Sequence, residues 1–117
     1  MITGFSSSMS ALIAFGKRMA VAANNVANLQ SEGFKKSRAL LEEESRGGVA
    51  GHVETVNTPG VVMTEEDQQG GVQKELSNVD LEKEIPETIL TERGYQANLK
   101  TLETEEEMLG YLLDTKG

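Results

Sequence analysis

The sequence predicts a mainly α protein, in which long N- and C-terminal helices pair as a coiled coil and a small β-rich or irregular segment lies between them. Near both ends of the chain, apolar residues recur at alternating spacings of four and three, which is typical of a helix with one apolar face. The central part holds short valine-rich runs separated by glycine and proline, as strands and turns do. We therefore divide the 117 residues into an N-terminal helix and turn, a middle segment and a C-terminal helix, over residues 1–34, 35–77 and 78–117.

The N-terminal helix is predicted from an apolar seam with only two charged residues around it. Thr3 or one of the serines at 6–8 can start this helix by accepting a hydrogen bond from a free backbone N–H. Asn28 and Gly33 can end it, because both tolerate the backbone conformation found after helices. A small residue such as Gly16 lets a partner helix approach closely. The seam consists of Phe5, Met9, Leu12, Gly16, Met19, Ala23 and Val26.

The C-terminal helix has the same spacing but carries more charge. We expect its regular part to start near Pro86, because proline lacks an N–H and is tolerated only in a first turn. Residues 79–85 would then form a turn or a separate short helical segment. Gly94 costs about 1 kcal/mol relative to alanine in a helix interior, which indicates close packing at this position. The seam consists of Leu81, Ile85, Thr88, Glu92, Tyr95, Leu99, Leu102, Glu106, Leu109 and Leu113.

The middle segment is expected to contain short strands at 49–56 and 61–64, joined by a turn at 57–60. A second turn is expected at the glycine pair 70–71. A ribbon of two or three strands is only marginally stable alone, so it should rest on a helix or on another subunit.

Composition excludes several classes of function. Eleven basic and nineteen acidic residues give a net charge of −8, which disfavours binding to nucleic acid or to anionic lipid. The chain has no cysteine, and its single histidine, His52, has no second imidazole with which to hold a transition metal. No apolar run is long enough for direct insertion into a membrane. We therefore expect no catalytic, cofactor-binding or metal-binding residues, and a protein that is not an enzyme.

Two helices alone cannot bury both apolar faces. If the two seams face each other, flanking side chains such as Ile13 and Leu90 stay in water, and each forgoes about 1.5–3 kcal/mol. An exposed apolar stripe indicates an interaction surface, and a head-to-tail contact between copies generates a ring or a filament. The alternative is that each seam simply faces the core of its own domain, which periodicity alone does not exclude. The predicted assembly interface consists of Phe5, Met9, Leu12, Met19, Val26, Leu81, Ile85, Tyr95, Leu99, Leu102, Leu109 and Leu113.

Two sequence motifs favour assembly. Residues 22–35 read Ala-Ala-Asn-Asn-Val-Ala-Asn-Leu-Gln-Ser-Glu-Gly-Phe-Lys and closely resemble the N-terminal signature of bacterial flagellar rod and hook proteins. Residues 77–81 and 92–98 read Ser-Asn-Val-Asp-Leu and Glu-Arg-Gly-Tyr-Gln-Ala-Asn, and they resemble the C-terminal signature of the same family. In physical terms, the three asparagines of the first motif can bind the last helical carbonyls or tolerate a left-handed backbone. The motif residues are Asn24, Asn25, Asn28, Gly33, Phe34, Asn78, Val79, Asp80, Arg93, Tyr95, Gln96 and Asn98.

The resemblance implies a structural subunit of the bacterial flagellar basal-body rod, similar to a proximal rod protein with a short middle segment. By analogy, the terminal helices assemble into an axial tube with other copies and with other rod and hook subunits, and the middle segment faces outward. The resemblance also implies a periplasmic location in the rod and export through the flagellar type III apparatus without a cleaved signal peptide. In agreement, the apolar run at 11–15 is short and is followed, not preceded, by positive charges. The alternative is a soluble coiled-coil adaptor or scaffold that binds a partner helix.

Overall fold

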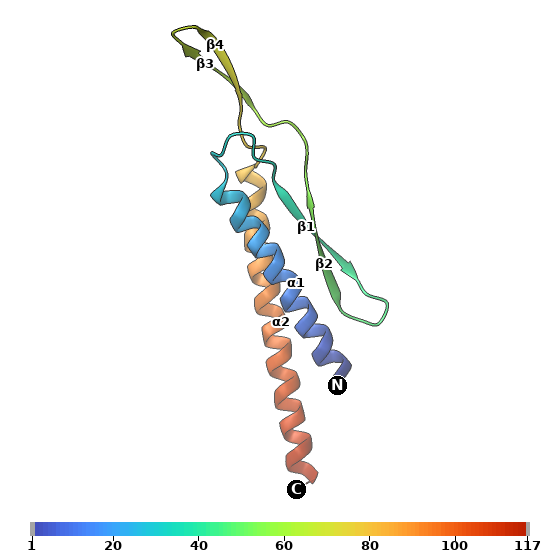
Figure 1. Cartoon of the computed structure of the whole chain (residues 1–117). Coiled ribbons are helices and arrows are strands. Elements are labelled where there is room, and N and C mark those ends of the chain that lie inside the picture. Colours follow the sequence, from blue (N-terminus) through green and yellow to red (C-terminus); the bar gives the residue numbers. More distant parts are fainter. Residues whose placement is uncertain (1, 117) are drawn as a thin grey trace.

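The computed structural model describes residues 2–116, and the side chains of residues 4–115. The molecule is long and thin, with extents of 83 × 24 × 16 Å. Its two helices lie side by side and run in opposite directions, and both hairpins leave from the same end of the helix pair (Figure 1). The predicted fold class, two long helices in contact with a small β-rich middle segment, is confirmed. The elements are α1 (Ile2–Ala27), β1 (Ser37–Glu43), β2 (Val49–Thr55), β3 (Val62–Asp67), β4 (Gly70–Glu75) and α2 (Leu81–Lys116).

Helix α1 begins at Ile2, so the cap predicted at the serines 6–8 is wrong. These serines lie inside the helix because Ser8 is buried against α2, where its Oγ lies 3.5 Å from Oε1 of Glu105. The side chain of Thr3, the other predicted cap, lies outside the described side chains. The predicted end of the helix is confirmed: Nδ2 of Asn28 donates to a carbonyl of the last turn at 2.9 Å, and the glycine at 33 has a φ of 66°.

Helix α2 begins at Leu81, so the start predicted at Pro86 is wrong. Asp80 caps the helix, because its Oδ1 accepts a hydrogen bond from the N–H of Glu82 at 3.2 Å and its carbonyl accepts one from Glu84 at 3.0 Å. The first turn is therefore complete before the proline, whose missing N–H removes a single bond near the start. The segment before the proline belongs to α2 and is not a separate helix.

The middle segment forms two antiparallel hairpins. Strand β1 pairs with β2 in a register that runs from Ser37↔Thr55 to Glu43↔Val49. Strand β3 pairs with β4 from Val62↔Glu75 to Asp67↔Gly70. The hairpin β1–β2 folds back along α1, whereas β3–β4 projects beyond the end of the helix pair (Figure 1).

The predicted strands at 49–56 and 61–64 correspond to β2 and β3, but they do not pair with each other. Residues 57–60 instead link the two hairpins, so the turn predicted there is wrong. The other predicted turn falls at Gln68 and Gln69, and Gly70, with a φ of 115°, already begins β4. The predicted pairing of the strands at 49–56 and 61–64 fails because β2 pairs with β1 instead. The sequence did not indicate strand β1.

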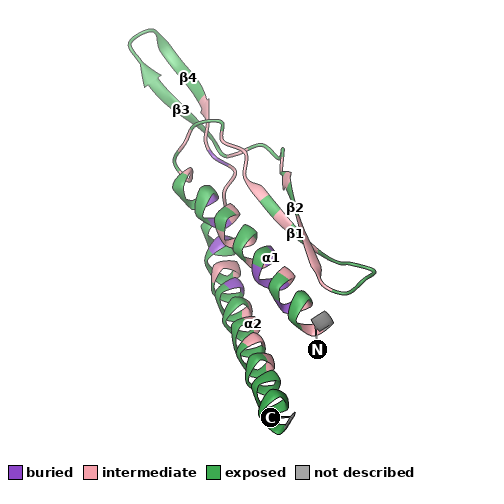
Figure 2. Ribbon diagram, turned by 60° about the horizontal axis from the view of Figure 1, so that its bottom comes forward, coloured by how far each residue is buried: buried purple, intermediate pink, exposed green. Residues whose placement is uncertain are grey.

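Both helices carry buried residues on their ribbons (Figure 2), and most of these residues are small or polar. The described buried residues of the two helices are Ser8, Ala11, Leu12, Ala14, Ala22 and Asn25 of α1 and Glu84 and Thr91 of α2. The predicted close packing at Gly94 is confirmed, because a Cβ there would lie 2.8 Å from Cζ of Phe15. The two apolar seams do not bury each other, because Leu12 is the only described seam residue that is buried. Gly94 accommodates the ring of Phe15 between the helices, whereas most of the bulkier seam residues remain exposed.

Candidate assembly surface

Asn25 joins three elements near the end of α1. Its side chain is 1% exposed. Nδ2 donates to the carbonyl of Ser37 at 2.7 Å and to Oε1 of Glu84 at 3.0 Å, while Oδ1 accepts from the N–H of Ser37 at 3.0 Å. The amide therefore binds both backbone groups of the first residue of β1 and also a carboxylate of α2. The prediction that Asn25 binds the last helical carbonyls is wrong, because its side chain points across the contact to the strand.

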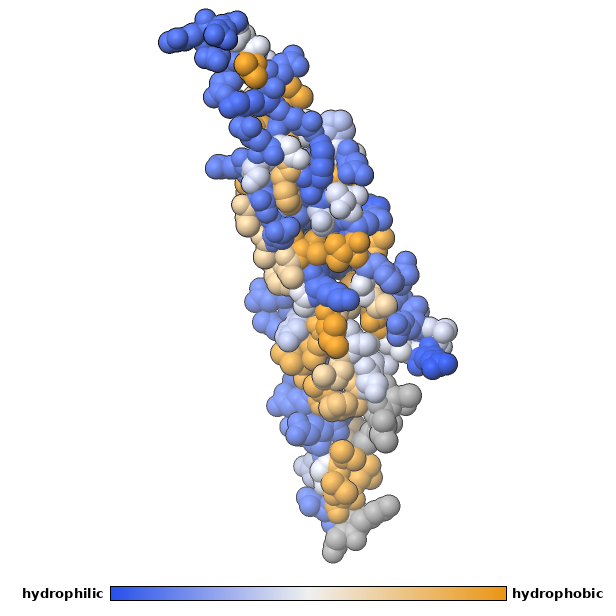
Figure 3. Space-filling model, viewed as in Figure 1, coloured by the Kyte–Doolittle hydropathy of each residue, from blue (hydrophilic) through white to orange (hydrophobic). Residues whose placement is uncertain are grey.

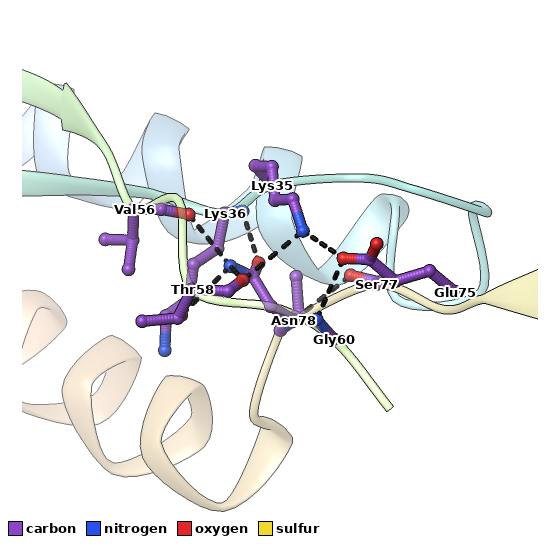
Figure 4. A network of polar contacts seen from close by, with 9 residues as sticks. Lys35, Lys36, Val56, Thr58, Gly60, Glu75, Ser77 and Asn78 are labelled. Carbon is purple, nitrogen blue, oxygen red and sulfur yellow. Dashed lines mark hydrogen bonds and ion pairs between the residues drawn. The ribbon is translucent and has the colours of Figure 1, made fainter. Parts of the chain in front are cut away.

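Asn78 has a corresponding role just before α2 (Figure 4). Its Oδ1 accepts from the N–H of Lys36 at 2.6 Å, and its Nδ2 donates to the carbonyls of Val56 and Thr58 at 2.8 and 2.9 Å. Asn78 therefore ties the start of β1 to the end of β2. Together, Asn25 at the end of α1 and Asn78 before α2 hold the consecutive residues 36 and 37, where β1 begins.

Three segments meet around the side-chain amides of Asn25 and Asn78. We call this region the junction, and it consists of residues 33–37, 56–61 and 75–78. The carboxylate of Glu75 binds the ammonium of Lys35 and accepts from the N–H of Gly60 at 3.1 Å (Figure 4). The hydrogen bond from Lys35, followed by the one from Gly60, lowers the pKa of Glu75 below its ordinary value. A Cβ at Gly60 would overlap the carbonyl of Leu76, so the chain crosses here backbone to backbone. The junction thus fixes both hairpins to the helix pair by hydrogen bonds.

The other motif residues have local roles or are exposed. Phe34 and Val79 are half-buried beside the junction, and the carbonyl of Phe34 accepts from the N–H of residue 78 at 3.2 Å. Nδ2 of Asn98 donates to a carbonyl one turn earlier in α2 at 2.9 Å. Arg93 and Gln96 are exposed on α2. The motif residues therefore cluster at the junction and along the adjoining half of α2.

Most residues of the predicted assembly interface lie at the surface of the single chain. Figure 3 shows hydrophobic side chains on the surface along much of the molecule. Met19 and Leu102 are half-buried, and Leu12 is buried within the chain at 8% exposure. Exposed large apolar side chains in such number indicate a contact surface. The exposed members range from 38% for Leu81 to 65% for Leu113, and they are Phe5, Met9, Val26, Leu81, Ile85, Tyr95, Leu99, Leu109 and Leu113.

An open groove runs along one side of the helix pair. It consists of two adjoining hollows of about 470 and 420 Å³ that share Met19. Met19 and Val26 of the first seam border it, as do Tyr95 and Leu99 of the second seam. The two seams thus flank a common groove. We call this surface the helix groove, and it is lined by Phe15, Gly16, Met19, Ala22, Ala23, Val26, Ala27, Thr88, Thr91, Glu92, Tyr95, Gln96 and Leu99.

The last part of α2 extends past the first residues of α1 (Figure 1). We call residues 108–115 the α2 tip. Its large apolar side chains, Met108, Leu109, Tyr111, Leu112 and Leu113, are between 50% and 76% exposed. The acidic residues in and before the tip are Glu103, Glu105, Glu106, Glu107 and Asp114, with no basic residue among positions 103–115. Helix α1 has the opposite charge, since its only charged residues are Lys17 and Arg18.

The described residues hold no group of three or more histidine, aspartate or glutamate side chains placed to bind a metal ion. His52 is exposed on β2, with its Nε2 3.7 Å from a carboxylate oxygen of Glu42. Among the described helices, none combines the length and the apolar character that a membrane crossing needs.

The described geometry is that of an elongated chain with exposed apolar side chains along both helices. Comparison with known families gives two matches. Residues 5–35 match the family described as flagella basal body rod protein, and residues 68–115 match the flagellar basal body rod FlgEFG protein C-terminal family. No curated protein matches the chain.

The two matches include most of α1 and nearly all of α2. The chain belongs to the flagellar basal body rod protein family, and the resemblance of its two motifs to that family is confirmed. It is a structural subunit of the flagellar basal body rod and not an enzyme. Membership in the family implies assembly with other rod subunits.

Proposed function

We propose that this rod subunit assembles through its terminal helices, which pack against copies of the chain and against other rod and hook subunits in an axial tube. The observation that carries the proposal is that most apolar residues of both seams stay exposed in the single chain and that part of each seam borders the helix groove. The hairpins, which leave from one end and one side of the helix pair, would face outward. The interface residues are those predicted above, with Leu12 excepted because it is buried within the chain.

The free energy available from this surface is large for a chain of this size. Burying one large aliphatic side chain contributes about 1.5–3 kcal/mol, and nine predicted interface residues are exposed. Within a single chain, little else stabilises the outer parts of the helices, because the buried contacts consist of small and polar groups. Association of subunits would therefore order and stabilise the helix ends.

A charge placed on this surface tests the proposal. Leu99→Glu and Leu109→Glu each put a carboxylate where a neighbouring subunit would cover it, at a cost of several kcal/mol. Both leucines are about half exposed in the single chain, so the variants should fold normally. We expect them to lose concentration-dependent association in sedimentation and to fail to restore motility in a strain that lacks the protein. Gln69→Glu, at the tip of the exposed hairpin β3–β4, is the matched control and should behave as the unaltered chain.

Two outcomes would contradict the proposal. Normal assembly of both leucine variants would mean that a different face of the molecule makes the contacts. A stably folded monomer whose sedimentation and helix content do not change with concentration would instead favour an adaptor that binds the helix of another protein.

We also infer that the chain reaches the periplasmic rod through the flagellar type III apparatus without cleavage. In support, the chain has no cysteine to form disulfides, and Leu12 is the only large apolar side chain that is buried among the described residues. The intact mass of the protein recovered from purified basal bodies tests the inference. A mass that includes the residues of α1 is expected, and removal of an N-terminal segment would contradict it.

A further inference from the structure

We propose that the α2 tip of one copy occupies the helix groove of the next copy, so that the contact between copies is head-to-tail. This inference rests on the proposed function and names which surfaces meet. The groove is lined by residues 88–99 of α2, and the tip is the end of the same helix. Because α2 is straight, the tip of a chain cannot fold back into the groove of that chain. A contact between two different surfaces of identical chains repeats from copy to copy.

The groove is long enough to hold the tip. On α1, the groove is lined from Phe15 to Ala27, which corresponds to about 18 Å of helix at 1.5 Å per residue. The tip, residues 108–115, spans roughly 11 Å by the same measure. The apolar rows of the tip lie at helical spacing, with Met108 above Leu112 and Leu109 above Leu113. A single helical tip with two such rows can therefore lie in the groove along its whole length.

Gly16 makes the groove accessible to such a helix. Gly16 lines the groove, and a Cβ at this position would meet no atom within 4 Å. Gly94, by contrast, is closely covered by Phe15 of the same chain. The open position at Gly16 has no function within the single chain, and it provides the close approach that a second helix needs.

The charges favour the tip-to-groove contact over a contact between two tips. The segment that leads into and includes the tip contains five acidic and no basic residues, so two tips side by side would bring like charges together. The α1 wall of the groove belongs to a helix without any acidic residue. The one charged residue that lines the groove is Glu92, on the α2 wall. The tip therefore fits best against α1 of another copy.

Cysteine cross-linking tests this arrangement directly, because the chain contains no cysteine of its own. Chains with Gly16→Cys and chains with Leu112→Cys are prepared separately and mixed at concentrations at which the unaltered chain associates. The mixture should form disulfide-linked dimers, whereas each variant alone should not. Ala97→Cys is the matched control: Ala97 is exposed on α2 but does not line the groove, so its mixture with Leu112→Cys should not cross-link.

A steric variant gives an independent measurement. Gly16→Leu places a large side chain in the groove. Its Cβ would meet no atom of the same chain within 4 Å, so the monomer should keep its helix content. We expect it to weaken association by about tenfold or more. Ala97→Leu adds the same side chain to a part of α2 outside the groove and should leave association unchanged.

The outcomes separate the inference from the proposed function. Association without a cross-link between positions 16 and 112 would overturn the inference and leave helix-mediated assembly intact, with a sister subunit or a hairpin as the occupant of the groove. Cross-linking of the Leu112→Cys chain with itself would also overturn it, in favour of a contact between tips. Failure of the unaltered chain to associate at any concentration, alone or with other rod subunits, would contradict both.

Discussion

Replacing Asn25 by alanine should weaken the attachment of the hairpin β1–β2 to the helix pair more than any other single change at the junction. The side chain makes three hydrogen bonds while only 1% exposed, and all three partners belong to other parts of the chain. Alanine leaves the N–H and the carbonyl of Ser37 and the buried carboxylate of Glu84 without this partner.

The magnitude follows from the number of groups left unsatisfied. An unpaired buried polar group costs about 1–3 kcal/mol, and partial access of water at the half-buried Ser37 reduces its share. We therefore expect Asn25→Ala to lower the free energy of unfolding by about 3–5 kcal/mol, a large part of the roughly 5–15 kcal/mol that stabilises a typical domain. Urea denaturation followed by circular dichroism measures the change, and hydrogen exchange at the amide of Ser37 locates it.

Asn24→Ala is the matched control, because Asn24 is exposed and its side chain only accepts from Asn28 at 3.3 Å. It should cost less than about 1 kcal/mol. Asn25→Asp separates hydrogen bonding from packing, because it keeps the size of the side chain but points a second oxygen at the carbonyl of Ser37 and at Glu84. It should be at least as destabilising as alanine. Equal unfolding midpoints for the alanine variants at 24 and 25 would refute this account of the junction.

Two further predictions follow from the structure. Gly94→Ala should destabilise the chain by about 1–2 kcal/mol in urea denaturation, because the new methyl group would overlap the ring of Phe15. Gly16→Ala, whose methyl group meets only open space, should stabilise the chain by up to about 1 kcal/mol. Stabilisation by both changes would contradict close packing at Gly94. A carboxyl titration by NMR should give Glu75 a midpoint below the ordinary value of 4.5, and Lys35→Met should move it back upward. Since folding lowers the pKa of Glu75, its carboxylate stabilises the junction above about pH 4.5 and ceases to do so as the pH falls through the folded pKa. A titration midpoint that does not respond to Lys35→Met would show that the ion pair does not form.

The two long helices could be predicted because their apolar spacing extends over many turns. Their boundaries could not, because they depend on single local interactions. Pro86 indicated a later start for α2, but the cap at Asp80 completes a turn before the proline is reached. Strand β1 could not be predicted either, since its Ala-Leu-Leu-Glu-Glu sequence favours a helix. Its extended form depends on pairing with β2 and on the amides of Asn25 and Asn78, which are distant in the sequence.

The apolar pattern also identified the wrong contact between the helices. Periodicity detects large hydrophobic residues, and in this chain most of those residues are exposed, with four of them at the open groove. The groups that hold the helices together, such as Ser8, Thr91 and Gly94, have no hydrophobic signal by which to find them. The motif drew attention to Asn25, but only the structure shows that it binds a strand and not the end of its own helix.

The largest side chains that are fully buried in this protein are those of Asn25 and Thr91. Such polar side chains add little hydrophobic free energy. Asn25 acts instead through its hydrogen bonds, which require one alignment of its partners. The shape of the single chain therefore depends on specific hydrogen bonds more than on apolar burial. In the proposed assembly, contacts with neighbouring rod subunits would add the apolar burial that the single chain lacks.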